Sequence, residues 1–171
     1  MNVLSEDQIG LITSKVLEIH EEQKETMEKK EKDKRLRNTK LLLRNYRSFK
    51  NYAEKIEVEK TAEWEEINVM ELLIVGEDLV KSIRETTQRT LVMVRHIDQA
   101  LLTLKYIYSL EKHSGTRRQY DILQARFIKG ALIEEIAEEN EINNRSVYKA
   151  LDAAIERLSI ILFGVYGLRI E

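Results

Sequence analysis

The sequence contains no cysteine and no proline, and only six of its 171 residues are glycine. The absence of cysteine excludes disulfide bonds, thiolate metal ligands and cysteine nucleophiles. Proline and glycine interrupt helices and strands more often than other residues do, so their scarcity indicates few breaks in regular structure. With 43% hydrophobic residues, the chain also lacks the low hydrophobicity that is typical of disordered proteins. Together these features predict an all-α fold.

Long hydrophobic runs are also missing from the chain. Segments such as LVMV at 91–94 are far shorter than the roughly 20 apolar residues of a membrane-spanning helix. The N-terminal residues do not combine a charged start with an apolar signal core. We therefore expect a cytoplasmic protein with no membrane partner.

Groups that could support catalysis are scarce. His20, His96 and His113 are far apart, none has a metal ligand at helical spacing, and no glycine-rich phosphate loop exists. His96 is expected to lie on a helix surface or to pack against other side chains, and not to be a metal ligand. The carboxylates of EEIAEEN, 134–140, indicate a solvated helix face and not an acid–base pair. We expect no enzyme activity, no metal and no cofactor.

The net charge of −2 conceals two blocks of opposite sign. Residues 18–28 are acid-rich, whereas 29–50 contain ten Lys or Arg and two acidic residues, a local charge of +8. Two interpretations remain open: a solvated helix whose blocks face other chains or helices, or an electrostatic footprint for phosphates. Under the second interpretation, Arg44 and Arg47 are candidate DNA contacts.

Apolar spacing predicts two amphipathic helices in the first third of the chain. Ser5 and Gln8 fit a capping box at the start of the first helix. An exposed charged segment over about 24–37 follows, either as a helical spacer or as a linker. The first helix carries its apolar stripe at Ile9, Ile12, Val16 and Ile19, and the second at Leu42, Tyr46, Phe49, Ala53 and Ile56.

Further helices are predicted before residue 115. The segment 62–75 is interpreted as a helix that stops at Gly76. A longer helix over about 78–112 should form the spine of the core, so region 1–115 is expected to be a helical hairpin or bundle. Its buried positions should be Ile83, Thr90, Val94, Ile97, Leu101, Leu104 and Tyr108.

Residues 116–171 are predicted to form a second domain with a helix-turn-helix. Three helices, over 120–129, 132–139 and from 144 onward, have the size and the short connection that this motif requires. The turn has no glycine, so Asn140 or Glu141 must adopt its left-handed conformation, and Asn is the better suited. The core positions of the motif should be Ile133, Ile136, Ala137, Ile142, Val147, Leu151, Ile155 and Leu158.

The start of the third helix carries exposed polar side chains. Asn143 or Asn144 can cap this helix, and Arg and Asn side chains can bond guanine and adenine edges. A capped helix start in an ordinary helical bundle is the alternative interpretation. The candidate DNA-binding residues are Asn144, Arg145, Ser146, Tyr148 and Lys149, with Arg117 and Arg118 from the preceding helix.

The segment 120–164, from YDILQARF to RLSIILFG, resembles region 4 of bacterial sigma factors. It resembles more closely the phage transcriptional regulators of the ArpU and RinA families. A weaker resemblance to the upstream helices of such regulators extends over roughly 35–165. The resemblance implies a prophage-type activator of late genes that binds promoter DNA beside RNA polymerase. At Asn140 and Glu141 the family pattern commonly has Leu and Gly.

Three functions follow as hypotheses. The first is a DNA-binding transcription regulator with double-stranded DNA as its partner. Because residues 113–171 hold eight basic and nine acidic residues, such a regulator would need help from the basic block, from a homodimer or from RNA polymerase. The second is a sigma-like polymerase subunit, although no sigma region 2 is evident. The third is a helical assembly scaffold with no nucleic-acid role.

The C-terminal residues 159–170 form an apolar run. Ile160, Ile161, Phe163 and Tyr166 are expected to pack against Leu101–Tyr108 or against a second subunit.

Overall fold

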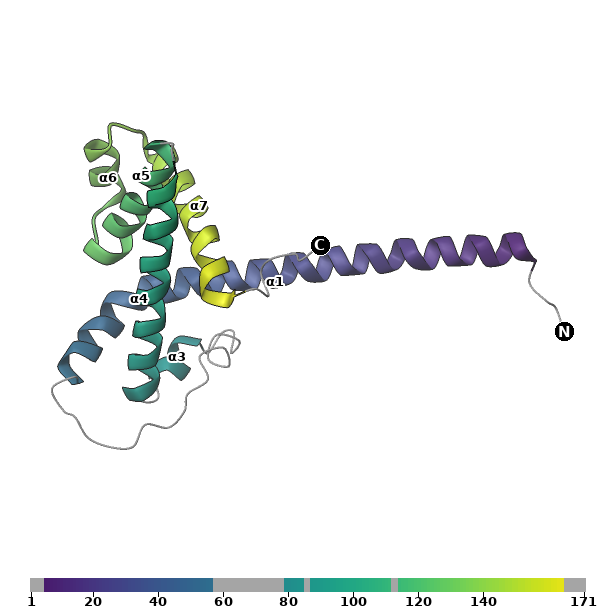
Figure 1. Ribbon diagram of the computed structural model, residues 1–171, viewed down its shortest axis with the longest axis horizontal. Coiled ribbons are helices and arrows are strands. Elements are labelled where there is room, and N and C mark those ends of the chain that lie inside the picture. The colour runs from purple at the N-terminus through teal and green to yellow at the C-terminus, as the bar shows by residue number, and fades with distance from the viewer. Residues whose placement is uncertain (1–4, 57–78, 85–86, 112–113, 165–171) are drawn as a thin grey trace. The chain divides into compact units, whose positions relative to one another are not determined.

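The computed structural model describes residues 5–56, 79–84, 87–111 and 114–164 (Figure 1). All regular structure in these ranges is helical, which confirms the predicted all-α fold. The chain divides into two compact units, Met1–Lys34 and Arg35–Glu171, and the boundary expected near Gly115 falls inside the second. The helix predicted over 62–75, and Tyr166, lie outside the described residues. No helix in the described ranges is both long and apolar enough to cross a membrane.

Helix α1 (Glu6–Ile56) is a single helix where the sequence predicted two. The charged segment 24–37 continues the helix because Lys, Glu and Arg are good helix formers and because this segment contains no glycine or proline. The predicted capping box is confirmed: Ser5 N donates to Gln8 Oε1 (3.0 Å), and Gln8 N donates to Ser5 Oγ (3.3 Å). Of the two alternatives for 24–37, the helical one is therefore correct.

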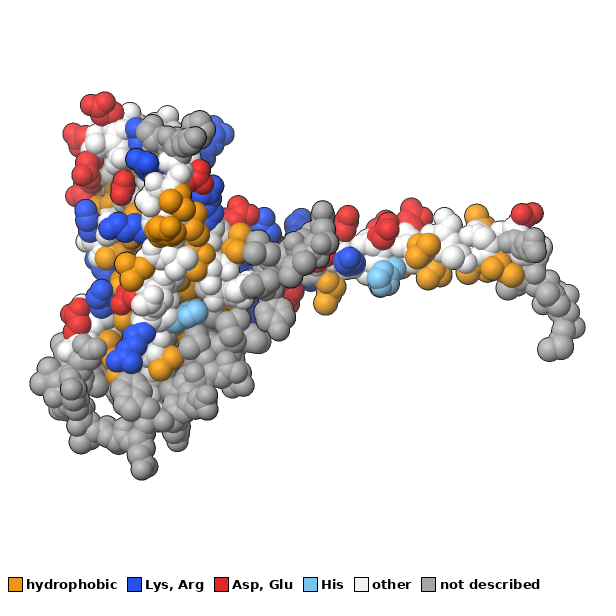
Figure 2. Space-filling model, viewed as in Figure 1, with side chains coloured by type: hydrophobic (Ala, Val, Ile, Leu, Met, Phe, Trp, Pro, Cys, Tyr) orange, Lys and Arg blue, Asp and Glu red, His pale blue; other side chains and the backbone are white. Residues whose placement is uncertain are grey.

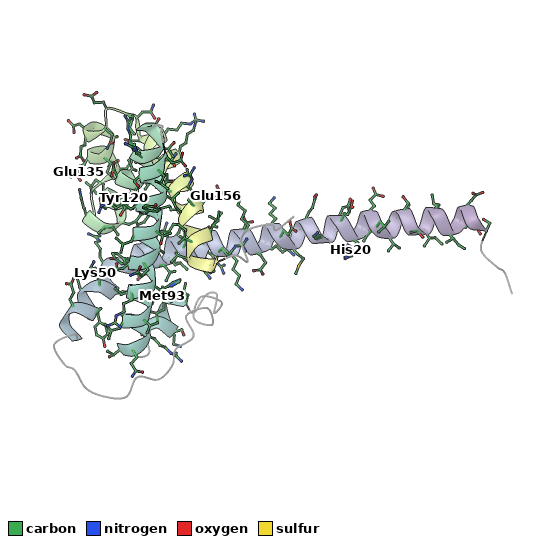
Figure 3. The ribbon with its side chains drawn as sticks, in the orientation of Figure 1. His20, Lys50, Met93, Tyr120, Glu135 and Glu156 are labelled. Carbon is green, nitrogen blue, oxygen red and sulfur yellow. The ribbon has the colours of Figure 1, made fainter. Side chains whose placement is uncertain are left out.

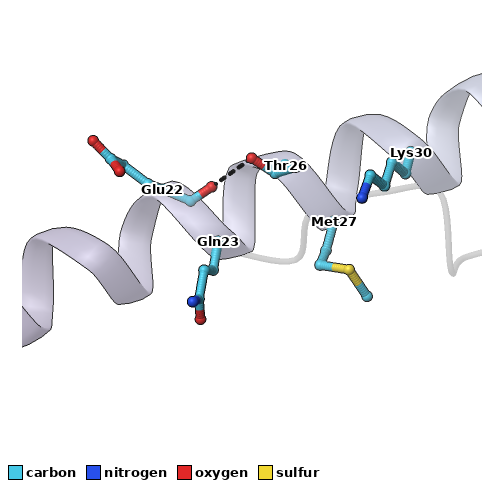
Figure 4. Close-up of a pocket in the computed structure, with 5 residues that line it drawn as sticks. All are labelled: Glu22, Gln23, Thr26, Met27 and Lys30. Carbon is cyan, nitrogen blue, oxygen red and sulfur yellow. Dashed lines mark hydrogen bonds between the residues drawn. The ribbon is translucent and has the colours of Figure 1, made fainter.

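The first unit exposes its apolar stripe. Ile9, Ile12, Val16 and Ile19 are between 50% and 58% exposed. Further along α1, a shallow hollow is lined by residues of this one helix (Figure 4), namely Glu22, Gln23, Thr26, Met27 and Lys30. Since side chains from a single helix cannot enclose a ligand, this hollow does not define a binding site.

The second unit contains the core. Residues 35–56 of α1 pack there with α3 (Leu79–Arg84), α4 (Thr87–Leu110), α5 (Ser114–Leu123), α6 (Ile133–Glu139) and α7 (Asn144–Phe163) (Figure 1). Every side chain predicted for the spine is buried, as are Leu42, Tyr46, Phe49 and Ala53 of α1. The alternation of three- and four-residue steps therefore identified the correct faces of both helices.

Tyr46 connects α1 to α4. Its hydroxyl donates to Asp98, and Lys50 Nζ lies 3.1 Å from the same hydroxyl. Burial, followed by the hydrogen bond and charge of Asp98, raises the pKa of Tyr46 above its ordinary value. The phenol therefore stays neutral, and its O–H donates a hydrogen bond to Asp98.

The prediction of one long helix over about 78–112 is wrong in its first part, because α3 and α4 are separate helices. Thr90 Oγ1 donates to the carbonyl of Ile83 (2.9 Å), and Arg89 Nη1 lies 3.5 Å from that of Ser82. In one continuous helix, residues seven apart would be about 10.5 Å apart along the axis. The side chains of Thr90 and Arg89 instead satisfy carbonyls at the end of α3 and stabilise the break.

Between α5 and α6 the chain forms a π-helix, η2 (Gln124–Lys129). It ends at Gly130, whose φ of 84° lies in the left-handed region that favours glycine. The amide N–H of Ala131 then donates to the carbonyl of Ala125 (3.0 Å). The predicted stop of this helix at Gly130 is therefore confirmed.

Helix α7 lies beside α4 and ends near its middle (Figure 1). His96 Nε2 is 3.0 Å from the carbonyl oxygen of Leu162, and Phe163 is buried. The apolar end of α7 therefore packs on α4, but the contact at His96 lies closer to the start of α4 than the expected Leu101–Tyr108. Just after the end of α4, Glu111 Oε1 accepts a hydrogen bond from Arg157 Nη1 of α7 (2.9 Å). His96 is thus a packing residue, as predicted.

Candidate nucleic-acid interface

A tight turn joins α6 to α7. The amide N–H of Ile142 donates to the carbonyl of Ala137 (2.9 Å), and that of Glu141 donates to Glu138 (3.1 Å). Glu141 has a φ of 54°, whereas Asn140 has −97°. Of the two candidates, Glu141 adopts the left-handed conformation and not the better suited Asn140. The turn forms without glycine, at a conformational cost of about 1–2 kcal/mol.

The orientation of α7 is set by a cap and a buried stripe. Asn143 is the N-cap residue, since its Oδ1 accepts from the amide N–H of Ser146 (2.8 Å). Val147 and Leu151 are buried against α6, where the small Ala137 is also buried and lets the two helices cross closely. These contacts fix which residues of α7 face outward.

Arg145, Tyr148, Lys149 and Asp152 share the outward face, at steps of three, one and three residues. We call these four residues the α7 surface stripe. All four are exposed, Tyr148 by 56%. The side chains of Arg145, Tyr148 and Lys149 form no hydrogen bond or ion pair with any other residue in the described ranges. Their polar groups can therefore bind a partner.

The other predicted contacts of α7 are less open. Asn144 is exposed at the first turn of the helix, but Ser146 is only partly exposed and its amide is bonded to the Asn143 cap. Ser146 therefore remains a candidate DNA contact mainly through its hydroxyl group.

The two arginines predicted from the preceding helix lie on α5. Both are exposed, but Arg117 Nε donates to the carbonyl of Glu111 (3.1 Å) and Nη2 to that of Ser109 (3.2 Å). Arg117 thus caps the C-terminal end of α4. No hydrogen bond or ion pair in the described ranges joins Arg118 to the α7 surface stripe.

Arg44 and Arg47 lie on α1 in the same compact unit as the helix-turn-helix. Both are exposed, and the guanidinium of Arg47 packs on Gly130, where a side chain would collide with it. Between α1 and α7, Lys40 Nζ pairs with Asp152 Oδ1 at 3.0 Å. Sequence analysis missed Lys40 as a neighbour of α7, although it shares a helix face with Arg37, Arg44 and Arg47.

Helix α6 opposes phosphate binding. Its outward side chains are carboxylates, gathered as a red cluster in Figure 2: Glu134, Glu135, Glu138 and Glu139. Glu135 (Figure 3) has a structural role, since its Oε2 accepts from the amide N–H of Leu132 (2.7 Å). The described residues 114–164 contain seven basic and eight acidic residues. Positive charge from outside the helix-turn-helix is needed to offset these acids near DNA.

The described ranges contain no group of three or more His, Cys, Asp or Glu side chains that could hold a metal ion. Comparison of the chain with protein-family models, curated protein sequences and solved structures gives no match.

Proposed function

We propose that this protein is a DNA-binding transcription regulator of the phage type, an activator of late genes that acts in the cytoplasm at a promoter with RNA polymerase. Helix α7 enters the major groove of double-stranded DNA, and Arg145 contacts a base edge. One observation carries the proposal: the Asn143 cap and the buried Val147 turn Arg145, Tyr148 and Lys149 outward from the start of α7. In DNA-binding helix-turn-helix motifs, the outward-facing residues at the start of the second helix contact the base edges.

Selection of bound duplexes from a random-sequence pool tests the proposal. The parent protein should enrich one sequence motif. Arg145→Ala should remove a base contact of about 1–3 kcal/mol and relax the preference at one position. Lys105→Ala is the matched control, because Lys105 is an exposed cation on α4. A pool that remains random after selection with the parent protein would overturn the proposal.

A sigma-like subunit of RNA polymerase is a second candidate function because of the charge balance. Residues 114–164, with seven basic and eight acidic residues, lack the positive surplus of an autonomous DNA-binding domain. A sigma-like subunit would co-purify with core polymerase and support transcription without the host sigma factor. Duplex binding by the isolated protein, with no effect of added polymerase, would reject this alternative.

A homodimer is also part of the proposal. Ile9, Ile12, Val16 and Ile19 follow the three-four spacing of a coiled-coil seam and are half exposed in the described chain. Substituting Ile12 and Val16 by Asp should lower the sedimentation coefficient of an associated protein. Leu11→Asp should not, since Leu11 is also exposed, by 65%, but lies off this stripe. Sedimentation of the parent protein as a monomer at all concentrations would reject the homodimer.

A further inference from the structure

Four cations form one ridge on α1. Arg37, Lys40, Arg44 and Arg47 follow one another at steps of three, four and three residues, which places them on a single helix face. We call these four residues the basic ridge. The adjacent face of α1 buries Leu43, Tyr46 and other residues in the core of the second unit. The core therefore fixes where the basic ridge lies relative to the helix-turn-helix.

Two contacts join the basic ridge to the helix-turn-helix. Lys40 pairs with Asp152, which belongs to the α7 surface stripe. Seven residues further along α1, or about 10.5 Å, Arg47 lies on Gly130 in the connection that leads into α6. The basic ridge therefore extends from the outward face of α7 to the start of the helix-turn-helix.

This juxtaposition changes the charge next to α7. Asp152 shares the outward face with Arg145 and Lys149, and its carboxylate would repel the phosphates of any duplex bound there. Lys40 neutralises that carboxylate from another helix. Adding the four cations of the basic ridge to the seven basic and eight acidic residues of 114–164 converts a local charge of −1 into +3. An approach by a polyanion is then electrostatically favourable.

We infer that the basic ridge is a second DNA-contact surface, which binds the sugar-phosphate backbone of the duplex that α7 enters. This inference rests on the proposed function. The side chain of Arg44 forms no hydrogen bond or ion pair with any residue in the described ranges, so its five N–H donors can bind phosphate oxygens. Contacts of this kind position the protein and add affinity but do not read sequence.

The salt dependence of binding by the full chain tests the inference. Each phosphate contact contributes roughly 0.9 to the slope of log affinity against log salt, so Arg44→Ala with Arg47→Ala should lower the slope by about 1.8. Affinity for a random-sequence duplex and for the selected motif should fall alike, while the selected motif stays the same. The matched control is Lys24→Ala with Lys105→Ala, which removes two exposed cations from elsewhere and should leave the slope unchanged.

Thermal melts monitored by far-UV circular dichroism identify any loss of folding in the double variant. The single variant Arg44→Ala gives a second test, because it leaves the contact between Arg47 and Gly130 intact. An unchanged slope in a folded double variant that keeps its sequence preference would overturn the inference and leave the proposed function standing. A changed sedimentation coefficient with an unchanged slope would also overturn it and would assign the ridge to another protein chain. Absence of salt-dependent duplex binding by the parent protein would overturn the proposed function itself.

Discussion

At the scale of single residues, the turn before α7 contains the clearest departure from common sequence preference. Glu141 holds a left-handed conformation that glycine adopts without strain. The Glu141→Gly variant should therefore be more stable by about 0.5–1 kcal/mol, which is the strain removed less the added entropy of the unfolded chain. Urea denaturation measures the change.

Asn140→Gly serves as the control, because Asn140 has a negative φ and donates Nδ2–H to the carbonyl of Ile136 (2.9 Å). This variant should lose stability. If both glycine variants shift the urea midpoint in the same direction, the assignment of the strained residue is incorrect.

Val147 tests the register of α7 at the same scale. Its side chain has no exposed surface, so Val147→Asp places an unpaired charge in the core and should destabilise the second unit by about 3 kcal/mol or more. The neighbouring Tyr148→Asp, on the outward face, should change stability by less than about 0.5 kcal/mol. Thermal melts of the two variants compare them directly, and equal melting temperatures would contradict the outward orientation of Tyr148.

At the scale of helices, the pairing of α7 with α4 holds the helix-turn-helix against the rest of the second unit. Leu162 is buried at the end of α7, beside the hydrogen bond between its carbonyl and His96. Leu162→Ala should destabilise the unit by about 2–5 kcal/mol. Leu102→Ala on α4 is the matched control with little expected effect, since Leu102 is 58% exposed. A small effect of Leu162→Ala in chemical denaturation would show that α7 is held by its other contacts alone.

Much of the helical organisation could be predicted from the sequence. Hydrophobic spacing identified the buried faces of α1, α4, α6 and α7. The capping patterns located Ser5 and left Asn143 or Asn144 as the cap of α7, of which the structure has Asn143. The continuity of α1 was left open between a helical spacer and a linker, because a charged segment buries nothing and hydrophobic spacing then carries no signal. The break between α3 and α4 was missed because it is stabilised by Thr90 and Arg89, which bond backward to α3 and do not disrupt the local pattern.

The candidate interface was predictable only in part. Local spacing placed Arg145, Tyr148 and Lys149 on the outward face of α7, and the structure has them exposed there. It could not reveal that Lys40 meets Asp152, since these residues are 112 positions apart and the contact depends on how α1 packs in the core. The choice of Glu141 over Asn140 was also beyond local preference, because the hydrogen bonds that close the turn fix the left-handed position.

At the scale of the whole molecule, the two compact units differ in what their surfaces offer. The first presents an exposed apolar stripe, and the second presents the α7 surface stripe beside the basic ridge. Under the proposed function, association and DNA binding use different parts of the chain. The Ile12 and Val16 substitutions should therefore alter sedimentation and leave the identity of the selected DNA motif unchanged. A different motif selected by this variant would show that the two activities are not separate.

The central claim is that the start of α7 lies in the major groove. Dimethyl sulfate methylates guanine N7, which faces that groove. The claim is therefore tested directly by comparing which guanines of the selected duplex are methylated when the parent protein or the Arg145→Ala variant is bound. We predict that the parent protein protects guanines within the motif and that Arg145→Ala exposes one of them at saturating protein. Complete methylation of every guanine in the bound duplex, or a protection pattern that Arg145→Ala leaves unchanged, would contradict the account.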